Sequence, residues 1–287
     1  MFYFDKLKSK KSFLFRIIGR CILVIFCFCL LGYLLRLIIS NQKSRLEVIF
    51  LDVGQGDAIL IKNISGNNIL IDGGPDNLVL RRLGEMLPFW SRKIDYLILS
   101  HYHDDHLVGL VEVLKRYRIE NIIYLENNFS SPILKLFLQE AEKRKIKILK
   151  LFSSARINFS STCFLDLLNP ESLGVKSEAN NSVVTKINCE SKKFLFSGDN
   201  GFKVENALLK INWNLQADIF KASHHGSNYS NGLVFLKAVK PQKIIVSVGA
   251  LNRFNHPGEQ FLGRTLEAGL EIIRTDQAGT IKIFGQY

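Results

Sequence analysis

Apolar residues follow two different patterns along the chain. Residues 21–39 form one apolar run whose only charged residue is Arg36, near its end, whereas from residue 46 onward short apolar runs alternate with Gly- and Asn-containing turns. A run of about 20 apolar residues matches the thickness of a bilayer. The pattern predicts a basic segment over 1–20, a transmembrane helix over 21–39, a linker over 40–45 and a globular domain over 46–287.

Within the globular part, strands come first and then alternate with helices. The first series comprises strands at 46–52, 57–62, 68–72, 95–100, 121–125 and 145–150, with helices at 77–88, 106–117 and 132–144. The second comprises strands at 163–168, 182–188, 193–199, 217–223, 243–249, 271–275 and 279–284, with helices after 201, near 231–239 and at 260–269. Two such halves predict sheets packed face to face with helices outside, a four-layer αβ/βα sandwich.

Charge is concentrated before the apolar run. Residues 1–40 hold seven basic residues and one acidic residue, so they contribute +6 of the net +12 and leave +6 for the rest. The positive-inside bias places the N-terminus in the cytoplasm and the globular domain outside a single-pass cell-membrane anchor. No A-x-A cleavage pattern follows the run, which favours an anchor over a signal peptide. The alternative is a buried helix of a soluble protein, which apolarity on all faces disfavours.

The five cysteines indicate no metal site. Cys21, Cys27 and Cys29 lie in the apolar run, and no C-x-x-C pair exists. Cys163 and Cys189 lie on different predicted strands. A disulfide between them is compatible with an extracytoplasmic domain, but their spacing does not indicate one, so we expect two buried thiols.

The histidines carry the candidate chemistry. All six occur in three clusters, each directly after a predicted strand: His101, His103 and His106; His224 and His225; His256. A single histidine at such a place is more often a surface or core residue, but six of six at strand ends predict a shared cleft. Imidazoles with carboxylates are ligands for divalent metals, and the strand-terminal Asp199 is the natural bridge between two ions.

These motifs resemble the metallo-β-lactamase-fold hydrolase superfamily. LDVGQGDAILI, ILIDGG, DYLILSHYHDDHLVGL, KFLFSGD, FKASHHGSNYS and FNHPGEQ are similar, more narrowly, to the metallohydrolase domain of ComEC-type DNA-uptake competence proteins. The resemblance covers about residues 46–284. It implies the four-layer fold, a site for one or two metal ions and, for the competence branch, a nuclease acting on DNA outside the membrane. In that branch the domain accompanies a many-span channel, which a lone anchor cannot form, so a separate channel protein is an expected partner.

The resemblance also implies the metal ligands. His101 and His103 are expected to bind the first ion, and Asp105, His106 and His224 the second, with Asp199 bridging them. His225 is expected outside this ligand shell. Residues 107–223 lack the further histidine that most superfamily members have, and a turn containing Asn181 occupies that interval. The absence of this histidine shifts the metal preference of the first site towards Mn²⁺ or permits a single ion. Zn²⁺ is the default for the second site.

Further polar residues are expected around the ligands. Asp57 and Asp72 are predicted to accept the outer N–H of ligating imidazoles, with turn capping as the alternative. Asp104 is predicted to position the attacking water beside Asp105, with a solvated spacer as the alternative. The residues expected to bind a phosphoryl group are Asn181, Ser227, Asn252 and His256, with His256 also the general acid; a structural turn at His256 is the alternative.

Three functions are compatible with this sequence. The first is a metal-dependent phosphodiesterase or nuclease that attacks DNA with a metal-activated water. The second is a surface hydrolase of phosphocholine or teichoic-acid phosphodiesters, or of a lactone. The third is a non-catalytic binding module tethered to the membrane. No G-x-S-x-G elbow and no Gly-rich phosphate loop is present, so the sequence contains no competing nucleophile motif.

Overall fold

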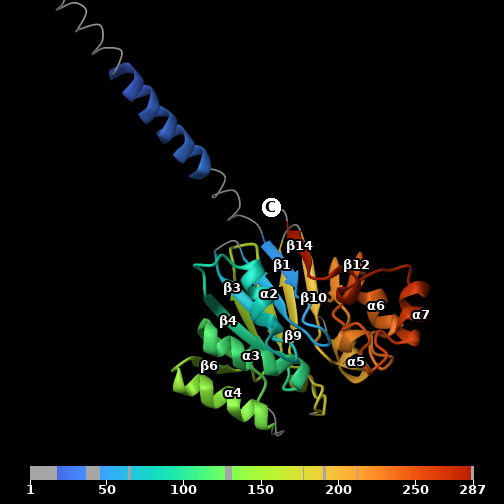
Figure 1. Cartoon of the computed structure of the whole chain (residues 1–287). Coiled ribbons are helices and arrows are strands. Elements are labelled where there is room, and N and C mark those ends of the chain that lie inside the picture. The colour runs from blue at the N-terminus through green and yellow to red at the C-terminus, as the bar shows by residue number, and fades with distance from the viewer. Residues whose placement is uncertain are drawn as a thin grey trace, which may run out of the picture. The chain divides into compact units, whose positions relative to one another are not determined.

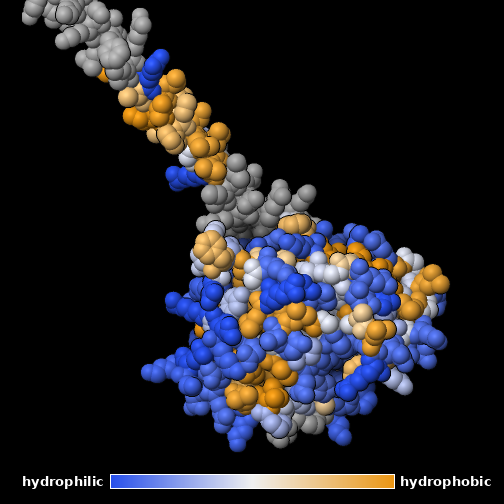
Figure 2. Space-filling view, viewed as in Figure 1, coloured by the Kyte–Doolittle hydropathy of each residue, from blue (hydrophilic) through white to orange (hydrophobic). Residues whose placement is uncertain are grey.

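The computed structural model describes residues 18–36, 46–63, 66–126, 131–176, 178–189, 192–211 and 213–285. The chain divides into two units, residues 1–44 and 45–287. The first contains a helix, Ile18–Arg36, of mean hydropathy 2.4 with no buried face. Apolar side chains cover this helix (Figure 2). It is long and apolar enough to cross a membrane, and residues 37–39 of the predicted span lie outside the described residues.

The described part of the second unit contains two seven-stranded mixed sheets. In spatial order, the first holds β14 (Ile281–Gly285), β1 (Leu46–Phe50), β2 (Ile59–Lys62), β3 (Asn68–Ile71), β4 (Lys93–Leu99), β5 (Arg118–Tyr124) and β6 (Lys147–Lys150). The second holds β13 (Glu271–Arg274), β12 (Lys243–Val246), β11 (Ile219–Lys221), β10 (Lys193–Phe196), β9 (Val184–Asn188), β8 (Phe164–Leu168) and β7 (Ser154–Asn158).

Helices cover the outer face of each sheet (Figure 1). The first sheet carries α2 (Leu78–Met86), α3 (Asp104–Arg116) and α4 (Pro132–Lys143), and the second carries α5 (Phe202–Lys210), α6 (Leu233–Val239) and α7 (Glu259–Glu267). Shorter helices are η1 (Pro170–Leu173), η2 (Ser223–Gly226) and α8 (Thr275–Ala278). Between the sheets, apolar side chains such as Phe50 and Phe196 pack edge to face at 5.7 Å. These layers confirm the predicted four-layer αβ/βα sandwich.

Parallel pairing places the functional loops at one end of each sheet. Strands β3 to β6 are parallel neighbours in the first sheet, and β10 to β13 are parallel in the second. Side chains that follow parallel strands gather at their carboxyl ends. The predicted histidine clusters follow β4 and β11, so this end of the fold is where the candidate site forms.

The structure differs from the prediction at several elements: β14, predicted in the second series, pairs with β1 in the first sheet, and the short helix α8 was not predicted. Strand β7 is absent from the predicted series, because only Ile157 is buried in this edge strand and it has no apolar run. Helix α3 begins at Asp104, two residues earlier than predicted, so Asp104, Asp105 and His106 form its first turn. The early start fixes the direction of two candidate ligands.

The expectation of two free thiols is wrong. Cys163 and Cys189 form a disulfide, with Cα atoms 4.2 Å apart. Strands β8 and β9 are antiparallel and pair Phe164 with Asn188. Cys163 precedes Phe164 and Cys189 follows Asn188, so the two cysteines lie opposite each other. Such register cannot be obtained from the spacing of the two cysteines.

Candidate metal centre

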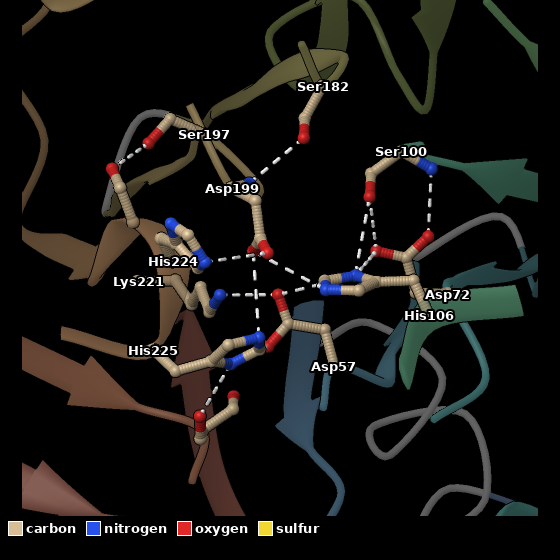
Figure 3. Close-up of polar contacts among 12 residues, drawn as sticks. Asp57, Asp72, Ser100, His106, Ser182, Ser197, Asp199, Lys221, His224 and His225 are labelled. Atoms are coloured by element: carbon tan, nitrogen blue, oxygen red, sulfur yellow. Dashed lines mark hydrogen bonds and ion pairs between the residues drawn. The ribbon is translucent and has the colours of Figure 1, made fainter. Parts of the chain in front are cut away.

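Side chains from both sheets converge at the carboxyl ends of the parallel strands. Asp72 follows β3, His101 and His103 follow β4, and Asp199 follows β10. Asp105 and His106 come from the first turn of α3, whereas His224 and His225 lie in η2 after β11. Figure 3 shows His106, His224 and His225 around the carboxylate of Asp199. The expected cleft is therefore formed by residues up to 153 positions apart, from Asp72 to His225.

Asp199 stands between two groups of possible ligands. Its Oδ2 lies 3.6 Å from His101 Nε2, and His101, His103 and Asp199 form the first group. Its Oδ1 lies 3.4 Å from His106 Nε2 and 3.6 Å from His225 Nε2. Asp105, His106, His225 and Asp199 form the second group, in which the ligand atoms lie within 4.8 Å of one another.

The atoms that face one another in this centre are buried and unpaired. Among the described residues, His101 Nε2, His106 Nε2, His225 Nε2 and Asp199 Oδ1 have no hydrogen-bond partner. A buried polar atom without a partner costs about 1–3 kcal/mol, so four such atoms gathered around Asp199 favour a bound ligand. Imidazole nitrogens with carboxylate oxygens suit Zn²⁺, Mn²⁺ and similar divalent ions. The residues present therefore fit one or two divalent cations.

The outer nitrogen of each buried imidazole is held by a neighbouring group. His225 Nδ1 donates to the Ser247 carbonyl at 2.9 Å, and His106 Nδ1 lies 2.8 Å from Asp72 Oδ2. His101 Nδ1 lies 3.1 Å from Ser100 Oγ. A donating Nδ1–H leaves the Nε2 lone pair facing the centre, which is the tautomer that a metal ligand needs.

Asp72 lies beside an imidazole of the centre. Besides facing His106, it accepts hydrogen bonds from Ser100 N at 2.8 Å and Ser100 Oγ at 2.6 Å. Burial raises the pKa of Asp72, and His106 counteracts part of that rise. For His106, in contrast, burial lowers the pKa. The carboxylates of Asp199 and Asp72 outweigh burial and raise the pKa of His106 well above its usual value.

The carboxylates of the centre are held in their ionised form. Burial raises the pKa of Asp199, but His106, His225 and His101 outweigh this effect and hold the pKa well below its usual range. For Asp105 burial again opposes ionisation, but the imidazoles of His225, 3.3 Å from Oδ2, and His106 outweigh this effect and hold the pKa below its ordinary value. Two anionic carboxylates among imidazoles provide a favourable potential for a cation.

The structure exchanges the places of the two adjacent histidines. His225, which was expected outside the shell, is the one grouped with Asp105, His106 and Asp199. His224 Nε2 lies 3.7 Å from Asp199 Oδ2, and its side chain is 30% exposed. Both residues have left-handed backbone, with φ of 50° and 55°, so their side chains do not alternate as on a strand.

Asn231 holds this turn in place. Its Oδ1 accepts from Ser223 N at 2.8 Å and its Nδ2 donates to the Ser223 carbonyl at 2.9 Å. Glu205 in turn accepts from the backbone N–H groups of Asn231 and Gly232. Asn231 and Glu205 were not among the predicted site residues, although GSNYSNG directly follows the His-His pair.

Two glycines allow the elements of the centre to approach closely. Gly198, with φ of 51°, precedes Asp199, and a Cβ there would lie 2.3 Å from Ser182 Cβ. A Cβ at Gly109 in α3 would lie 1.9 Å from the Gly73 carbonyl oxygen. Larger residues would separate the β3 loop from α3 and thereby move Asp72 away from His106.

Asp57 has a buried partner that was not predicted from the sequence. Its Oδ2 is ion-paired with Lys221 Nζ, and both side chains are buried. Its Oδ1 lies 3.5 Å from His225 Nδ1. The available signal was a lysine inside the apolar run ADIFKAS, where a buried cation needs an anion.

The residues predicted to bind substrate divide into two kinds. Ser227 and His256 line a cavity of about 770 Å³, and His256 Nδ1 has no partner among the described residues. The His256 ring lies 5.5 Å from that of His224, and burial together with His225 and His224 lowers the pKa of His256 to about 4. At neutral pH this imidazole is uncharged, which does not favour the general-acid role expected for it.

Asn181, Asn252 and Asp104 have other surroundings. Asn181 Nδ2 donates to the Lys176 carbonyl within its own turn. The amide of Asn252 lines the cavity but bonds four backbone groups of residues 249–256. Asp104 is exposed and has no hydrogen bond or ion pair with the described residues of the centre. The geometry thus favours structural or solvated positions for these three.

Comparisons with known proteins agree with this architecture. The family model of the metallo-beta-lactamase superfamily matches residues 51–249. ComE operon protein 3 of Bacillus subtilis is 28% identical over 257 residues, 84% of this chain and 33% of that protein. Competence protein ComA of Neisseria gonorrhoeae is 27% identical over 245 residues, 84% of this chain and 32% of that protein. The chain thus spans about a third of these relatives, and they confirm the resemblance to ComEC-type competence proteins.

A solved structure shares the fold. The metallo-beta-lactamase fold protein YhfI from Bacillus subtilis superposes with a TM-score of 0.57 at 12% identity, covering 83% of this chain and 100% of that chain. Because the family model covers more than half of the chain, the assignment does not depend on this distant likeness. The chain belongs to the metallo-β-lactamase superfamily.

Proposed function

We propose that this chain is a metal-dependent phosphodiesterase that cleaves DNA. The observation that carries hydrolysis is the gathering of unpaired histidine Nε2 atoms around the carboxylate of Asp199. The choice of DNA rests on the similarity to ComE operon protein 3 and Competence protein ComA over 84% of the chain.

The proposed site would hold one or two divalent cations, with Asp199 belonging to both groups of ligands. His101, His103 and Asp199 would hold one, and Asp105, His106, His225 and Asp199 the other. Zn²⁺ is the default and Mn²⁺ the alternative. Bound cations supply a Lewis acid that polarises the scissile phosphoryl group and lowers the pKa of water.

The protein groups fix this chemistry in place. Asp72 and the Ser247 carbonyl orient His106 and His225 through their Nδ1 atoms. The Asp105 carboxylate is 27% exposed, more than the other members of its group, and it stays ionised. It is therefore placed to accept a hydrogen bond from a water at the mouth of the centre and to orient that water for attack.

The cavity beside the centre suits a nucleic-acid strand. Tyr229 and Phe254 line it and are 79% and 49% exposed, and the Arg253 guanidinium lies 4.9 Å from the Phe254 ring centre. The Phe254 ring stacks on His256 at 5.8 Å. Exposed aromatic rings with a nearby arginine bind bases by stacking while the charge attracts phosphates.

The proposal includes the location of the reaction. The helix Ile18–Arg36 would anchor the chain with its N-terminus in the cytoplasm, as the basic residues before it favour. The domain over 46–287 would then act outside the membrane, and passage of DNA through the membrane would require a separate channel protein.

A cleavage assay with a matched variant tests the proposal. Full-length protein loaded with Zn²⁺ or Mn²⁺ is incubated with DNA and, in parallel, with a chromogenic phosphodiester. Asp105→Asn is expected to reduce DNA cleavage more than about 100-fold, since loss of even an outer partner of a ligand costs about 10–100-fold. Glu112→Gln, on the same helix but outside the centre, is the control.

Three results would contradict it. Full DNA cleavage by Asp105→Asn would show that the candidate metal centre does not catalyse the reaction. Turnover of the small phosphodiester without DNA cleavage would favour the surface hydrolase of phosphocholine or teichoic-acid diesters. No turnover of either by the metal-loaded protein would favour the tethered binding module.

A further inference from the structure

A surface at the far end of the first sheet is not used by the proposed chemistry. Strands β4 and β5 begin there, at Lys93 and Arg118, and run towards the metal centre. The seven residues of β4 place that end about 20 Å from the loop that carries His101. We call it the distal surface and define it by Phe89, Trp90, Arg92, Arg116 and Arg118.

Two large aromatic side chains project from the distal surface. Phe89 and Trp90, between α2 and β4, are 86% and 74% exposed. Their ring centres are 4.7 Å apart in an edge-to-face arrangement. Adjacent exposed aromatics on a folded domain indicate an interaction site, and tryptophan is the residue type enriched at the level of lipid headgroups.

Arginines without full ionic partners surround this pair. Within the part of the chain that the structure describes, Arg92 and Arg116 form no ion pair. The Arg118 side chain is 79% exposed, and its Nη2 lies 3.8 Å from Glu120. Arg116 lines two neighbouring hollows, one shared with Phe89 and Arg92 and the other with Arg118. The surface therefore offers aromatic and cationic groups side by side.

The chain enters the domain at this same end. Across the sheet, Glu47 pairs with Lys62, Lys62 with Asn68, and Asn68 N donates to Asp95 of β4 at 2.8 Å. The start of β1 and the end of β14 lie together at one end of the domain (Figure 1). In the sequence, nine residues, 37–45, separate the apolar helix from β1.

We propose that the distal surface docks on an anionic lipid bilayer, with Phe89 and Trp90 among the headgroups and Arg92 and Arg116 on lipid phosphates. The docking rests on the anchoring proposed above but does not depend on the reaction. The proposed anchoring supplies a bilayer to which the domain is covalently linked at this end. The aromatic pair and the distance from the metal centre favour lipid over nucleic acid as the ligand. Docked in this way, the metal centre faces away from the bilayer, where a polymeric substrate has access.

Tryptophan fluorescence tests this orientation. The chain has two tryptophans, Trp90 and Trp213, and Trp213 lines a hollow on the second sheet with Arg156 and Ile211. Full-length Trp213→Phe is reconstituted in vesicles of phosphatidylcholine and phosphatidylglycerol with brominated acyl chains. Trp90 fluorescence is expected to fall by about half or more, because bromine quenches tryptophan on contact at the interface. Trp90→Phe, which retains Trp213, is the matched control and is expected to change little.

A charge-reversal variant distinguishes a lipid bilayer from nucleic acid as the ligand of the distal surface. Arg92→Glu with Arg116→Glu is expected to abolish most of the quenching, while metal content stays unchanged because neither residue touches the centre. Trp90 that stays unquenched by brominated lipid and open to aqueous iodide would overturn the proposal. Loss of DNA binding in the double variant, with Trp90 unquenched in the parent, would overturn it in favour of a nucleic-acid surface. Neither result alters the cleavage assay with Asp105→Asn, so the two proposals fail independently.

Discussion

Lys221 and Asp57 form a buried ion pair that joins the two sheets across 164 residues of sequence. Lys221 is the last residue of β11, and Asp57 lies in the loop between β1 and β2. The free oxygen of Asp57 faces His225 Nδ1 at 3.5 Å. The pair therefore connects the packing of the sheets to the position of a candidate metal ligand.

Removing the lysine is expected to destabilise the fold strongly. Lys221→Met leaves the Asp57 carboxylate buried without its cation, so we expect the free energy of unfolding to fall by about 3–5 kcal/mol. Urea denaturation at a fixed metal concentration measures the change. Lys243→Met breaks the exposed pair with Glu271 and is expected to cost less than about 1 kcal/mol. Equal losses in both variants would contradict the role of the buried pair.

The two adjacent histidines are expected to differ in metal binding. His225→Ala removes a buried imidazole from the group around Asp199, so we expect metal affinity to fall more than about 100-fold. His224→Ala removes a partly exposed ring at the edge and is expected to lower affinity about tenfold or less. Metal content after dialysis against a chelator provides the measurement. The reverse order would restore the assignment made from sequence.

Glu205 is expected to make stability depend on pH. Burial raises its pKa from 4.5 to about 7, against the hydrogen bonds from Gly232 and Asn231 that lower it. Because the folded-state pKa lies above the unfolded value, the stabilising contribution is complete below pH 4.5 and is lost as pH rises through 7, by about 3 kcal/mol.

Comparison with a neutral variant isolates this contribution. The unfolding free energy of the wild type, relative to Glu205→Gln, is expected to decline between pH 5 and pH 8 by about 2–3 kcal/mol. Other titrating groups are common to both proteins and cancel in the difference. Glu267→Gln, an exposed substitution in α7, is expected to show no such trend, and a flat Glu205→Gln difference would contradict the prediction.

The disulfide is expected to form in the membrane-bound protein. Cys163 and Cys189 close a loop with a sequence separation of 26, for which the chain-entropy model gives about 3.5 kcal/mol of stabilisation. Peptide mapping without reductant, after alkylation in intact cells, detects the linked pair. Disulfides persist outside the cytoplasm, so recovery of two alkylated thiols would contradict both the pairing in cells and the proposed topology.

Hydrophobic periodicity predicted much of the architecture. The buried runs that became β4, β5 and β10 were visible as apolar segments, and the helices of each half followed from the longer period. Strand β7 was missed because an edge strand buries little, and a single buried Ile157 has no period. An edge strand is stabilised by pairing with its neighbouring strand, and a local hydrophobic pattern contains no information about that pairing.

The sequence by itself determined the family, the layered fold and the clustering of histidines at strand ends, because apolar patterns and ordered motifs are local properties of the chain. Tertiary structure decided which histidine of the pair joins Asp199, that Lys221 neutralises Asp57, and that Cys163 meets Cys189. These outcomes depend on left-handed backbone at residues 224 and 225 and on register between strands. Side-chain direction and strand register arise only when distant segments pack together, so no spacing along the chain specifies them.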